Sequence, residues 1–339
     1  MSCGLMGRRR FLTQVACLPF ATSLSRPACR HRALIAITLD LEMVRHYPRR
    51  GMLEWDYKKG DLDEATKRYA VRVAERAAEH GVKMHFFLVG RALEGRDVRW
   101  LRCIHDMGHP IGNHTYDHVY LLARRPEEIQ YRFRRCPWLI EGRSVAEVIE
   151  HNVRLTSRAF EQRLGFAPDG FRAPGGYATG LKGRADLQRM LQRAGFGWVS
   201  TLYPAHRLTA PGQRPGAELI AGILNAQQQA QPFRYPTGLL EIPMSPVSDV
   251  VAFRTQRWKL GWFLEVTERI VQYVIERRLV FDFLAHPACL LVEDPKLLII
   301  DRLCRWVQAA GEAAAVVTLE EIAHLWDDGA PAVGVQKPL

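Results

Sequence analysis

Short continuous apolar segments recur along this chain of 339 residues. Most are rich in β-branched or aromatic side chains and are followed by polar or glycine-containing sequence, which is typical of strands buried on both faces of a sheet. We expect strands at residues 33–39, 84–89, 171–176, 197–201, 238–243, 280–285 and 314–318.

The segments between them place apolar residues at intervals of three and four, which predicts amphipathic helices. Gly81 and Gly108 follow two of these segments and are expected to end the helices there. Residues 43–63 and 204–236 are polar or rich in proline, glycine and glutamine, and we expect loops, the second as an insertion. The predicted helices cover residues 64–80, 97–107, 145–164, 185–194, 262–278, 295–310 and 319–326.

Strands that alternate with helices predict a parallel sheet with helices packed outside it. The fold class is therefore α/β, and the architecture is either a (β/α) barrel or a doubly wound sheet. In both, the side chains that carry chemistry gather at the carboxyl ends of the strands. Polar residues that follow the predicted strands are thus the candidates for a functional site.

The first thirty residues carry a different pattern. A basic run at residues 8–10 precedes a modestly apolar stretch, residues 12–24, which is the order found in export signals. The sequence Arg-Arg-x-Phe-Leu resembles a twin-arginine signal and predicts a periplasmic or other extracytoplasmic location; a basic tail on a cytoplasmic protein is the alternative. We divide the chain into a leader (1–30), one folded domain (31–330) and a tail (331–339).

Composition narrows the function classes only slightly. The chain is 47% hydrophobic and 24% charged, as in ordinary globular proteins, and no stretch reaches the ~20 apolar residues of a membrane span. The net charge of +11 favours an anionic partner, but the basic residues are scattered, which argues against a specific nucleic-acid site. An Arg-rich surface without a dedicated polyanion site explains the charge, and binding to an acidic cell-wall polymer is the functional alternative. The seven cysteines form no C-x-x-C pair, so a cysteine zinc site is not indicated.

The strongest single candidate for chemistry is a pair of histidines. His114 and His118 are four residues apart, a spacing that places two side chains on one face of a helical turn, where both can reach one metal ion. Thr115 stands where the His-Glu-x-x-His proteases carry their general base, so a protease is not indicated. Two surface histidines without a ligand would give the same spacing, and the pair alone does not decide between these possibilities.

A third metal ligand is expected to be a carboxylate, because catalytic zinc sites commonly combine two histidines with Asp or Glu. Asp40 and Glu42 directly follow the first predicted strand and lie two residues apart, so both point to one face if the strand continues. Two carboxylates there are costly unless a metal or an arginine compensates them. A pair that caps a helix is the simpler alternative.

At this point the sequence resembles the NodB-homology polysaccharide deacetylases, carbohydrate esterase family 4. Four family motifs occur in the same order and with similar spacing over residues 33–326. The matches to Thr-Phe-Asp-Asp, His-Ser/Thr-x-x-His, Arg-x-Pro-x-Gly and Leu-x-His are Thr38-Leu39-Asp40-Leu41-Glu42, His114-Thr115-Tyr116-Asp117-His118, Arg172-Ala173-Pro174-Gly175-Gly176 and Leu284-Ala285-His286.

The resemblance implies a role for each matched residue. The metal ligands would be Glu42, His114 and His118. Asp40 would be the general base that takes a proton from the attacking water, and Arg172 would orient it through a charge-assisted pair. A backbone N–H near Gly175 would help to stabilise the oxyanion, and His286 would be the general acid that protonates the leaving amine.

Two departures from the family pattern stand out. The second acid of the first motif is Glu42, one position further on than usual, as in the branch that includes peptidoglycan-deacetylase-like and allantoinase-like members. Some allantoinase-like members have lost a histidine and the metal, but both histidines are present here, so we expect a metal. The Asp that would tune His286 is not identified, and Asp282 is only a possible substitute.

The resemblance implies an irregular seven-stranded (β/α) barrel and metal-dependent removal of N-acetyl groups from an amino-sugar polymer such as peptidoglycan. Zinc suits a site of two histidines and a carboxylate, and Co²⁺, Ni²⁺ or Fe²⁺ are compatible with it. One alternative is a hydrolase of small C–N substrates, such as cyclic amides, on the same barrel. Another is a glycan-binding protein without activity, which has no need to keep Asp40, Arg172 and His286.

Substrate contacts are predicted with less support from the motifs. Loop aromatics can stack on sugar rings or simply pack within their loops, and four of them are expected at the rim of the site: Tyr47, Trp55, Tyr57 and Tyr177. The residues expected to contact substrate in the pocket itself are Tyr177, Trp198 and Leu284.

Overall fold

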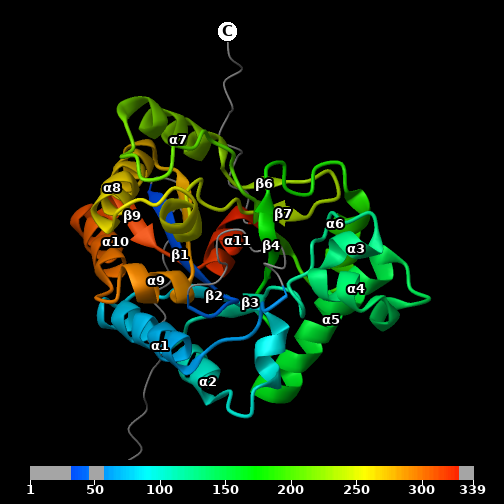
Figure 1. The fold of residues 1–339 in the computed structure, drawn as a ribbon. Coiled ribbons are helices and arrows are strands. Elements are labelled where there is room, and N and C mark those ends of the chain that lie inside the picture. The colour runs from blue at the N-terminus through cyan, green and yellow to red at the C-terminus, as the bar shows by residue number, and fades with distance from the viewer. Residues whose placement is uncertain (1–31, 46–56, 328–339) are drawn as a thin grey trace, which may run out of the picture.

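The structure, a computed structural model, describes residues 32–45 and 57–327 of the chain. The predicted leader and tail lie outside the described residues, as do Tyr47 and Trp55. Within the described part, the strands form one curled sheet with helices around it (Figure 1). The (β/α) barrel class predicted from the sequence is confirmed.

The sheet has nine strands in the described residues, in the order β6-β7-β5-β4-β3-β2-β1-β8, with β9 paired to β1. β6 (Phe233–Arg234) runs antiparallel to β7, and β9 (Ala314–Val316) lies off the main order. The other seven strands run parallel to their neighbours and line the barrel: β1 (Ala33–Leu41), β2 (His85–Leu88), β3 (Ile111–Asn113), β4 (Phe171–Tyr177), β5 (Trp198–Leu202), β7 (Leu240–Glu241) and β8 (Val280–Ala285).

No ladder within the described residues joins β7 to β8, and the chain after β7 spans this opening instead. The backbone N–H of Ser245 donates to the carbonyl oxygen of Asp282 in β8 at 2.8 Å. The hydroxyl of the same serine accepts from the N–H of Leu284 at 3.4 Å. The barrel is therefore closed on this side by an irregular segment, which places the residues that follow β7 beside the carboxyl end of β8.

Helices pack against the outside of the barrel, and apolar stripes on them account for most of the core. α5 begins at Ser144, whose side chain forms a capping box with Glu147, and it ends at Gly165 in the left-handed conformation. The helices and helical turns are α1 (Glu64–Glu79), η2 (Gly90–Glu94), α2 (Arg99–Asp106), α3 (Pro126–Ile129), α4 (Tyr131–Arg135), η3 (Pro137–Ile140), α5 (Val145–Leu164), α6 (Ala185–Arg193), α7 (Ala217–Gln229), η4 (Val250–Thr255), α8 (Leu260–Arg277), α9 (Pro287–Glu293), α10 (Leu298–Ala309), η5 (Gly311–Ala313) and α11 (Leu319–Asp327).

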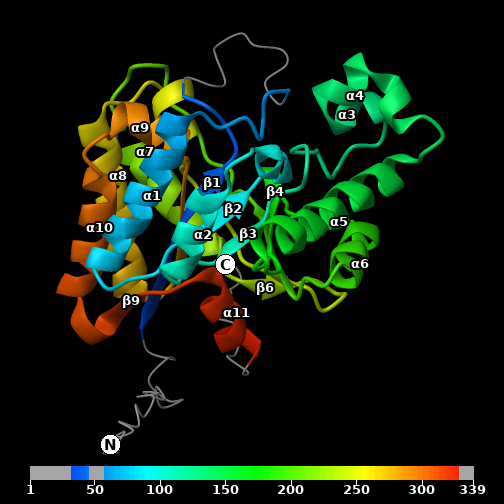
Figure 2. The same ribbon diagram turned by 90° about the horizontal axis from the view of Figure 1, so that it is seen from below.

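The two ends of the barrel differ. α11 lies beneath the amino ends of the strands, on the opposite side from α3 and α4 (Figure 2). Its residues Leu319 and Ile322 join a buried cluster with Phe87 and Trp198, which closes this end with apolar side chains. None of the helices in the described residues is long and apolar enough to cross a membrane.

The expectation that residues 204–236 form an irregular insertion is wrong, because this segment contains α7 and β6. The glutamines obscured the apolar spacing, although two of them have structural roles. The side-chain amide of Gln231 donates to the carbonyl oxygen of Val280 at 3.1 Å and accepts from its N–H at 2.8 Å. Gln227 donates to the same carbonyl oxygen at 2.8 Å. The glutamine-rich segment thus secures the first residue of β8.

Replacement of Gln231 with alanine is expected to lower the free energy of unfolding by about 1 to 3 kcal/mol, because the partly buried N–H of Val280 loses its acceptor. Urea unfolding followed by circular dichroism measures this difference. Gln229→Ala, at an exposed position two residues earlier, is the matched control and should change little. Equal stability of both variants would show that water replaces the amide without cost.

Candidate active site

A cavity of about 210 Å³ lies at the carboxyl ends of the strands. Its polar lining comes from distant parts of the chain: Asp40, Glu42, Lys59, His118, Ser248 and His286. Apolar side chains, among them Met43, Met244 and Leu284, form much of the remaining wall. The cavity therefore stands where a (β/α) barrel is expected to carry chemistry.

Asp40 and Glu42 are brought to this cavity by β1. Every residue of this nine-residue strand is buried, which fixes its position in the sheet, and its end carries both carboxylates to the same cavity. Each side chain is only 4% exposed. Burial alone would raise the pKa of Glu42, but Lys59 and the imidazoles beside it hold that pKa well below its usual range. Glu42 is therefore an ionised carboxylate in a site that water barely reaches.

His114 and His118 do approach each other, but not on a helical turn as the spacing suggested. They lie in an irregular segment after β3, where Thr115 and His118 have φ values of 59° and 58°. Asn113 holds this conformation by accepting from the N–H of Thr115 at 2.8 Å. Left-handed backbone at residues other than glycine costs about 1 to 3 kcal/mol and is concentrated at functional sites. The strained backbone here is the conformation that brings the two imidazoles together.

The tautomer of His114 is fixed by its neighbour. Its Nδ1 lies 2.9 Å from the carbonyl oxygen of Arg172, which can only accept, so Nδ1 carries the proton and Nε2 keeps its lone pair. This Nε2 is 3.2 Å from Oε2 of Glu42, a second acceptor, and a shared proton or a metal ion is needed between them. Such a backbone contact to the distal nitrogen is the usual way to orient a metal-binding histidine.

The donor atoms of Glu42, His114 and His118 lie within 4.8 Å of one another, and all three residues are buried. Burial lowers the pKa of His118 to about 4, which keeps its imidazole in the neutral form that binds metals. Two imidazoles and one carboxylate are the donor set of catalytic zinc sites. The residues present therefore fit a divalent cation.

Arg172 lies below Asp40 and is fully buried. Its guanidinium donates to Asp40 at 3.0 Å and to the hydroxyl of Thr38 at 2.7 Å, and it also pairs with Asp282. The same group lies over the ring of Phe87, 4.3 Å from its centre. These contacts fix the direction in which the Asp40 carboxylate points.

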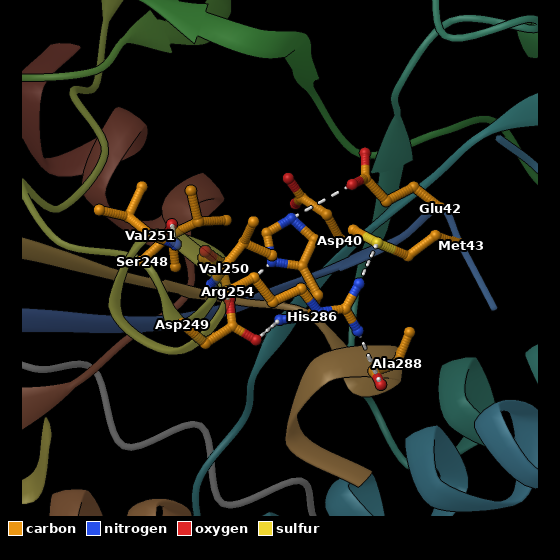
Figure 3. A network of polar contacts seen from close by, with 12 residues as sticks. Asp40, Glu42, Met43, Ser248, Asp249, Val250, Val251, Arg254, His286 and Ala288 are labelled. Carbon is orange, nitrogen blue, oxygen red and sulfur yellow. Dashed lines mark hydrogen bonds and ion pairs between the residues drawn. The ribbon is translucent and has the colours of Figure 1, made fainter. Parts of the chain in front are cut away.

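His286 follows β8, the neighbour of β1, and lines the same cavity beside Asp40 and Glu42. Its Nδ1 is 2.7 Å from Oδ1 of Asp249, and its backbone N–H donates to Oδ2 of the same residue at 2.8 Å (Figure 3). Its Nε2 lies 3.3 Å from Oε1 of Glu42. Burial alone would lower the pKa of His286, but Asp249 and Glu42 outweigh it and raise this pKa to about 10. His286 is therefore a proton donor at neutral pH.

Asp249 is the functional residue that the sequence analysis missed. Asp282, the possible substitute, binds Arg172 and Thr38 instead of His286. Asp249 lies between β7 and η4, 37 residues before the histidine, in a segment that carries no recognised motif. A buried aspartate in Pro246-Val247-Ser248-Asp249, soon after a predicted strand, was the signal available to find it.

The Gly175-Gly176 pair forms the rim beside Asp40. Both glycines have left-handed φ values, 78° and 61°, and both line the cavity. A Cβ atom on Gly176 would come within 2.8 Å of the Cβ of Tyr203, so only glycine fits there. The turn exposes backbone at Gly175 to the cavity, as a donor to an oxyanion requires.

Of the three predicted substrate contacts, only Leu284 lines the cavity. Trp198 is the first residue of β5 and therefore lies at the amino end of the barrel, where its indole donates to Glu320 of α11 at 2.6 Å. Tyr177 follows a register irregularity in β4 and packs into a buried cluster, with its hydroxyl accepting from the N–H of Leu121 at 3.1 Å. The predictions for these two aromatics are corrected accordingly: both are structural here.

The rim aromatic Tyr57 is 43% exposed, and its ring lies 6.0 Å from that of Tyr131 in an edge-on arrangement. It does not line the cavity. Lys59, two residues further on, does line it and contacts Glu42 directly. The polar sequence of this region predicts only a loop and indicates no role for Lys59.

Comparisons with known proteins agree with this geometry. Residues 61–190 match the family model for polysaccharide deacetylases. No curated protein sequence matches the chain. The matched region includes His114, His118 and Arg172, whereas Asp40, Glu42, Asp249 and His286 lie outside it and are placed by the structure.

Solved structures share the fold at low sequence identity. One, from Pseudomonas aeruginosa PAO1, is described as a probable polysaccharide deacetylase; it is 13% identical with a TM-score of 0.61, and the match covers 89% of this chain and 93% of that one. A second, described as a putative polysaccharide deacetylase from Mycobacterium smegmatis, is 16% identical with a TM-score of 0.58 over 91% and 95% of the two chains. The Puue allantoinase is 14% identical with a TM-score of 0.58 over 90% and 93%.

The family model covers the second and third motifs, at His114–His118 and Arg172–Gly176, and over residues 61–190 it agrees with the resemblance inferred from the motifs. The solved structures share the fold, which is the NodB-type (β/α) barrel that the resemblance implied.

Proposed function

We propose that this chain is a metal-dependent hydrolase that removes N-acetyl groups from an amino-sugar polymer such as peptidoglycan. The observation that carries the proposal is that a carboxylate suited to act as a base and an imidazole suited to act as an acid are both fixed in place beside the candidate metal ligands. Asp40 is paired with Arg172, His286 is paired with Asp249, and both face the cavity that Glu42 lines. An extracytoplasmic place of action, reached through the predicted twin-arginine signal, suits a cell-wall polymer.

Each step of amide hydrolysis has a residue in this site. Asp40, oriented by Arg172, accepts the proton of the attacking water. The backbone at Gly175 faces the cavity and can donate to the carbonyl oxygen as it gains charge. His286 donates its Nε2 proton to the leaving nitrogen, while Asp249 keeps the ring protonated and oriented.

A divalent cation held by Glu42, His114 and His118, for which zinc is the first choice, would polarise the acyl carbonyl and make the water more acidic. The carboxylate and imidazole donors also accept Co²⁺, Ni²⁺ or Fe²⁺. Elemental analysis of the purified chain identifies the metal independently of any substrate.

The function is tested by incubating the purified chain with acetylated chito-oligosaccharides and peptidoglycan fragments, with and without added zinc. The expected products are acetate and a free amine in equal amounts. A sample purified in the same way from cells that lack the chain serves as the blank. Failure to release acetate from every glycan would contradict the proposed function, and glycan binding without turnover would favour the binding protein.

A small-molecule C–N hydrolase is the second candidate, and the size of the cavity favours it. About 210 Å³ with apolar walls from Met244, Val250 and Val251 accommodates an acyl group or one small molecule, not a sugar chain. A polymer would have to present only its acetamido group to this cavity. Cyclic ureides in the same assay separate the two candidates, since ring opening without acetate release would reverse their order.

A further inference from the structure

Lys59 is a buried ammonium group at the centre of the candidate metal site. The side chain is 3% exposed and lines the cavity, and its Nζ contacts Oε1 of Glu42. Oε2 of the same carboxylate lies 2.6 Å from Nε2 of His118 and 3.2 Å from Nε2 of His114. The candidate metal-binding carboxylate therefore already has a cation of this chain on one of its two oxygens.

The backbone holds Lys59 in this position. The N–H of Gly60 donates to the carbonyl oxygen of Glu42 at 2.7 Å, which ties the turn at residues 57–60 to the end of β1. The guanidinium of Arg91 donates to the carbonyl oxygens of Tyr57 and Lys59 at 3.1 and 3.5 Å. Gly60 has a φ of 90°, and a Cβ atom there would lie 2.6 Å from the Cβ of Arg91. Lys59 thus contacts Glu42 from a turn that is hydrogen-bonded to the end of β1 and to Arg91.

The geometry around Glu42 shows what the lysine does to the site. The oxygen of Glu42 that contacts Nζ of Lys59 also lies 3.3 Å from Nε2 of His286, and the other oxygen faces the two histidines. A divalent cation held by Glu42, His114 and His118 would therefore share this buried carboxylate with the ammonium group. Two positive charges at such short range repel each other strongly where water is excluded.

We propose that Lys59 is a built-in counter-ion of Glu42 that a divalent cation must displace in order to bind, so that this lysine sets the metal affinity of the site. The inference rests on the metal role proposed for this site but not on the identity of the substrate. Its consequence is that the chain keeps a compact, charge-compensated site without metal and takes up metal only at concentrations high enough to displace the ammonium group from Glu42.

The test is calorimetric titration of Zn²⁺ into the full chain after treatment with a chelator. Lys59→Met removes the charge and keeps most of the side-chain volume, and it is expected to bind one Zn²⁺ at least about tenfold more tightly than the unmodified chain, because repulsion at this short range is removed. Lys58→Met is the matched control at the neighbouring, exposed position and should bind as the unmodified chain does. Equal or weaker binding by Lys59→Met, or no binding by either protein, would overturn the proposal.

Thermal unfolding gives a second readout. Without metal, Lys59→Met should unfold at a lower temperature than the unmodified chain, because Glu42 loses its counter-ion, and Zn²⁺ should raise its unfolding temperature by the larger amount. If the variant folds only with Zn²⁺ present, it should retain one Zn²⁺ per chain through a dialysis that removes Zn²⁺ from the unmodified chain. Loss of Zn²⁺ from both proteins in this dialysis would refute the inference. No substrate enters these measurements, so a chain that releases no acetate would refute the proposed function alone.

Discussion

Replacement of Asp249 with asparagine is expected to lower kcat for amide hydrolysis by about 100- to 10,000-fold, the usual contribution of a positioned acid or base, with little change in KM. Asparagine has the same size, but its amide nitrogen is a donor, so it can face Nδ1 of His286 only when Nδ1 has lost its proton. The imidazole then loses the charge that keeps it protonated. Steady-state kinetics on the substrate identified by the acetate screen measures the effect.

The same substitution predicts a change in pH dependence. Burial lowers the pKa of His286, but Asp249 and Glu42 together raise it to about 10, so removing the charge of Asp249 lowers that pKa. The protonated fraction of His286 then falls at a lower pH, and the alkaline limb of kcat/KM should move to lower pH. Asp282→Asn is the control, a buried aspartate that contacts Arg172 and not this histidine. Histidine side-chain NMR should show the shifted pKa in Asp249→Asn only; an unchanged rate and pH profile would contradict the role of Asp249.

Replacement of Arg172 with methionine is expected to cost about 3 to 5 kcal/mol of the free energy of unfolding, because it leaves Asp40 and Asp282 buried without their cation. Hydrolysis should also be lost, since the Asp40 carboxylate would lose the guanidinium that orients it toward the cavity. Urea unfolding measures the first effect and the acetate assay the second.

Two comparisons make this prediction specific. Arg184→Met removes an arginine that pairs with Asp186 near the surface, and it should cost no more than about 1 kcal/mol. The double variant Arg172→Met/Asp282→Asn also removes one of the two buried carboxylates that have lost their cation. It should therefore recover part of the free energy of unfolding that Arg172→Met loses. A loss below about 1 kcal/mol in Arg172→Met would mean that the two carboxylates are compensated by other groups.

The sequence predicts the site well where residues directly follow strands. In a parallel barrel the carboxyl ends of all strands meet, so Asp40 and His286, which follow predicted strands, had to converge. The His114 segment follows β3, a strand of three residues that the apolar pattern did not predict. Trp198 shows the reverse case. It lies in a predicted strand, but it is the first residue of β5. The apolar pattern alone does not reveal that this position lies at the amino end of the barrel, which α11 covers.

Other features depend on contacts between distant segments. Asp249 reaches His286 only because the chain after β7 replaces a strand in closing the barrel, and no periodic pattern marks such a segment. The His114–His118 spacing suggested a helix, whereas the side chain of Asn113 stabilises left-handed backbone in its place. The role of Lys59 likewise depends on a turn that is held by Arg91 from another part of the chain.

The position of β1 determines when this protein can complete its site during synthesis. Leu34 pairs with Val280, so β1 leaves the ribosome 246 residues before its partner in β8. At about 5 to 20 residues per second, this apolar strand waits roughly 12 to 50 s with one edge exposed. Asp40 and Glu42 are thus among the first residues of the site to be made, but they meet His286 only when translation is nearly finished. Protection of β1 by a chaperone during this interval would favour folding over aggregation.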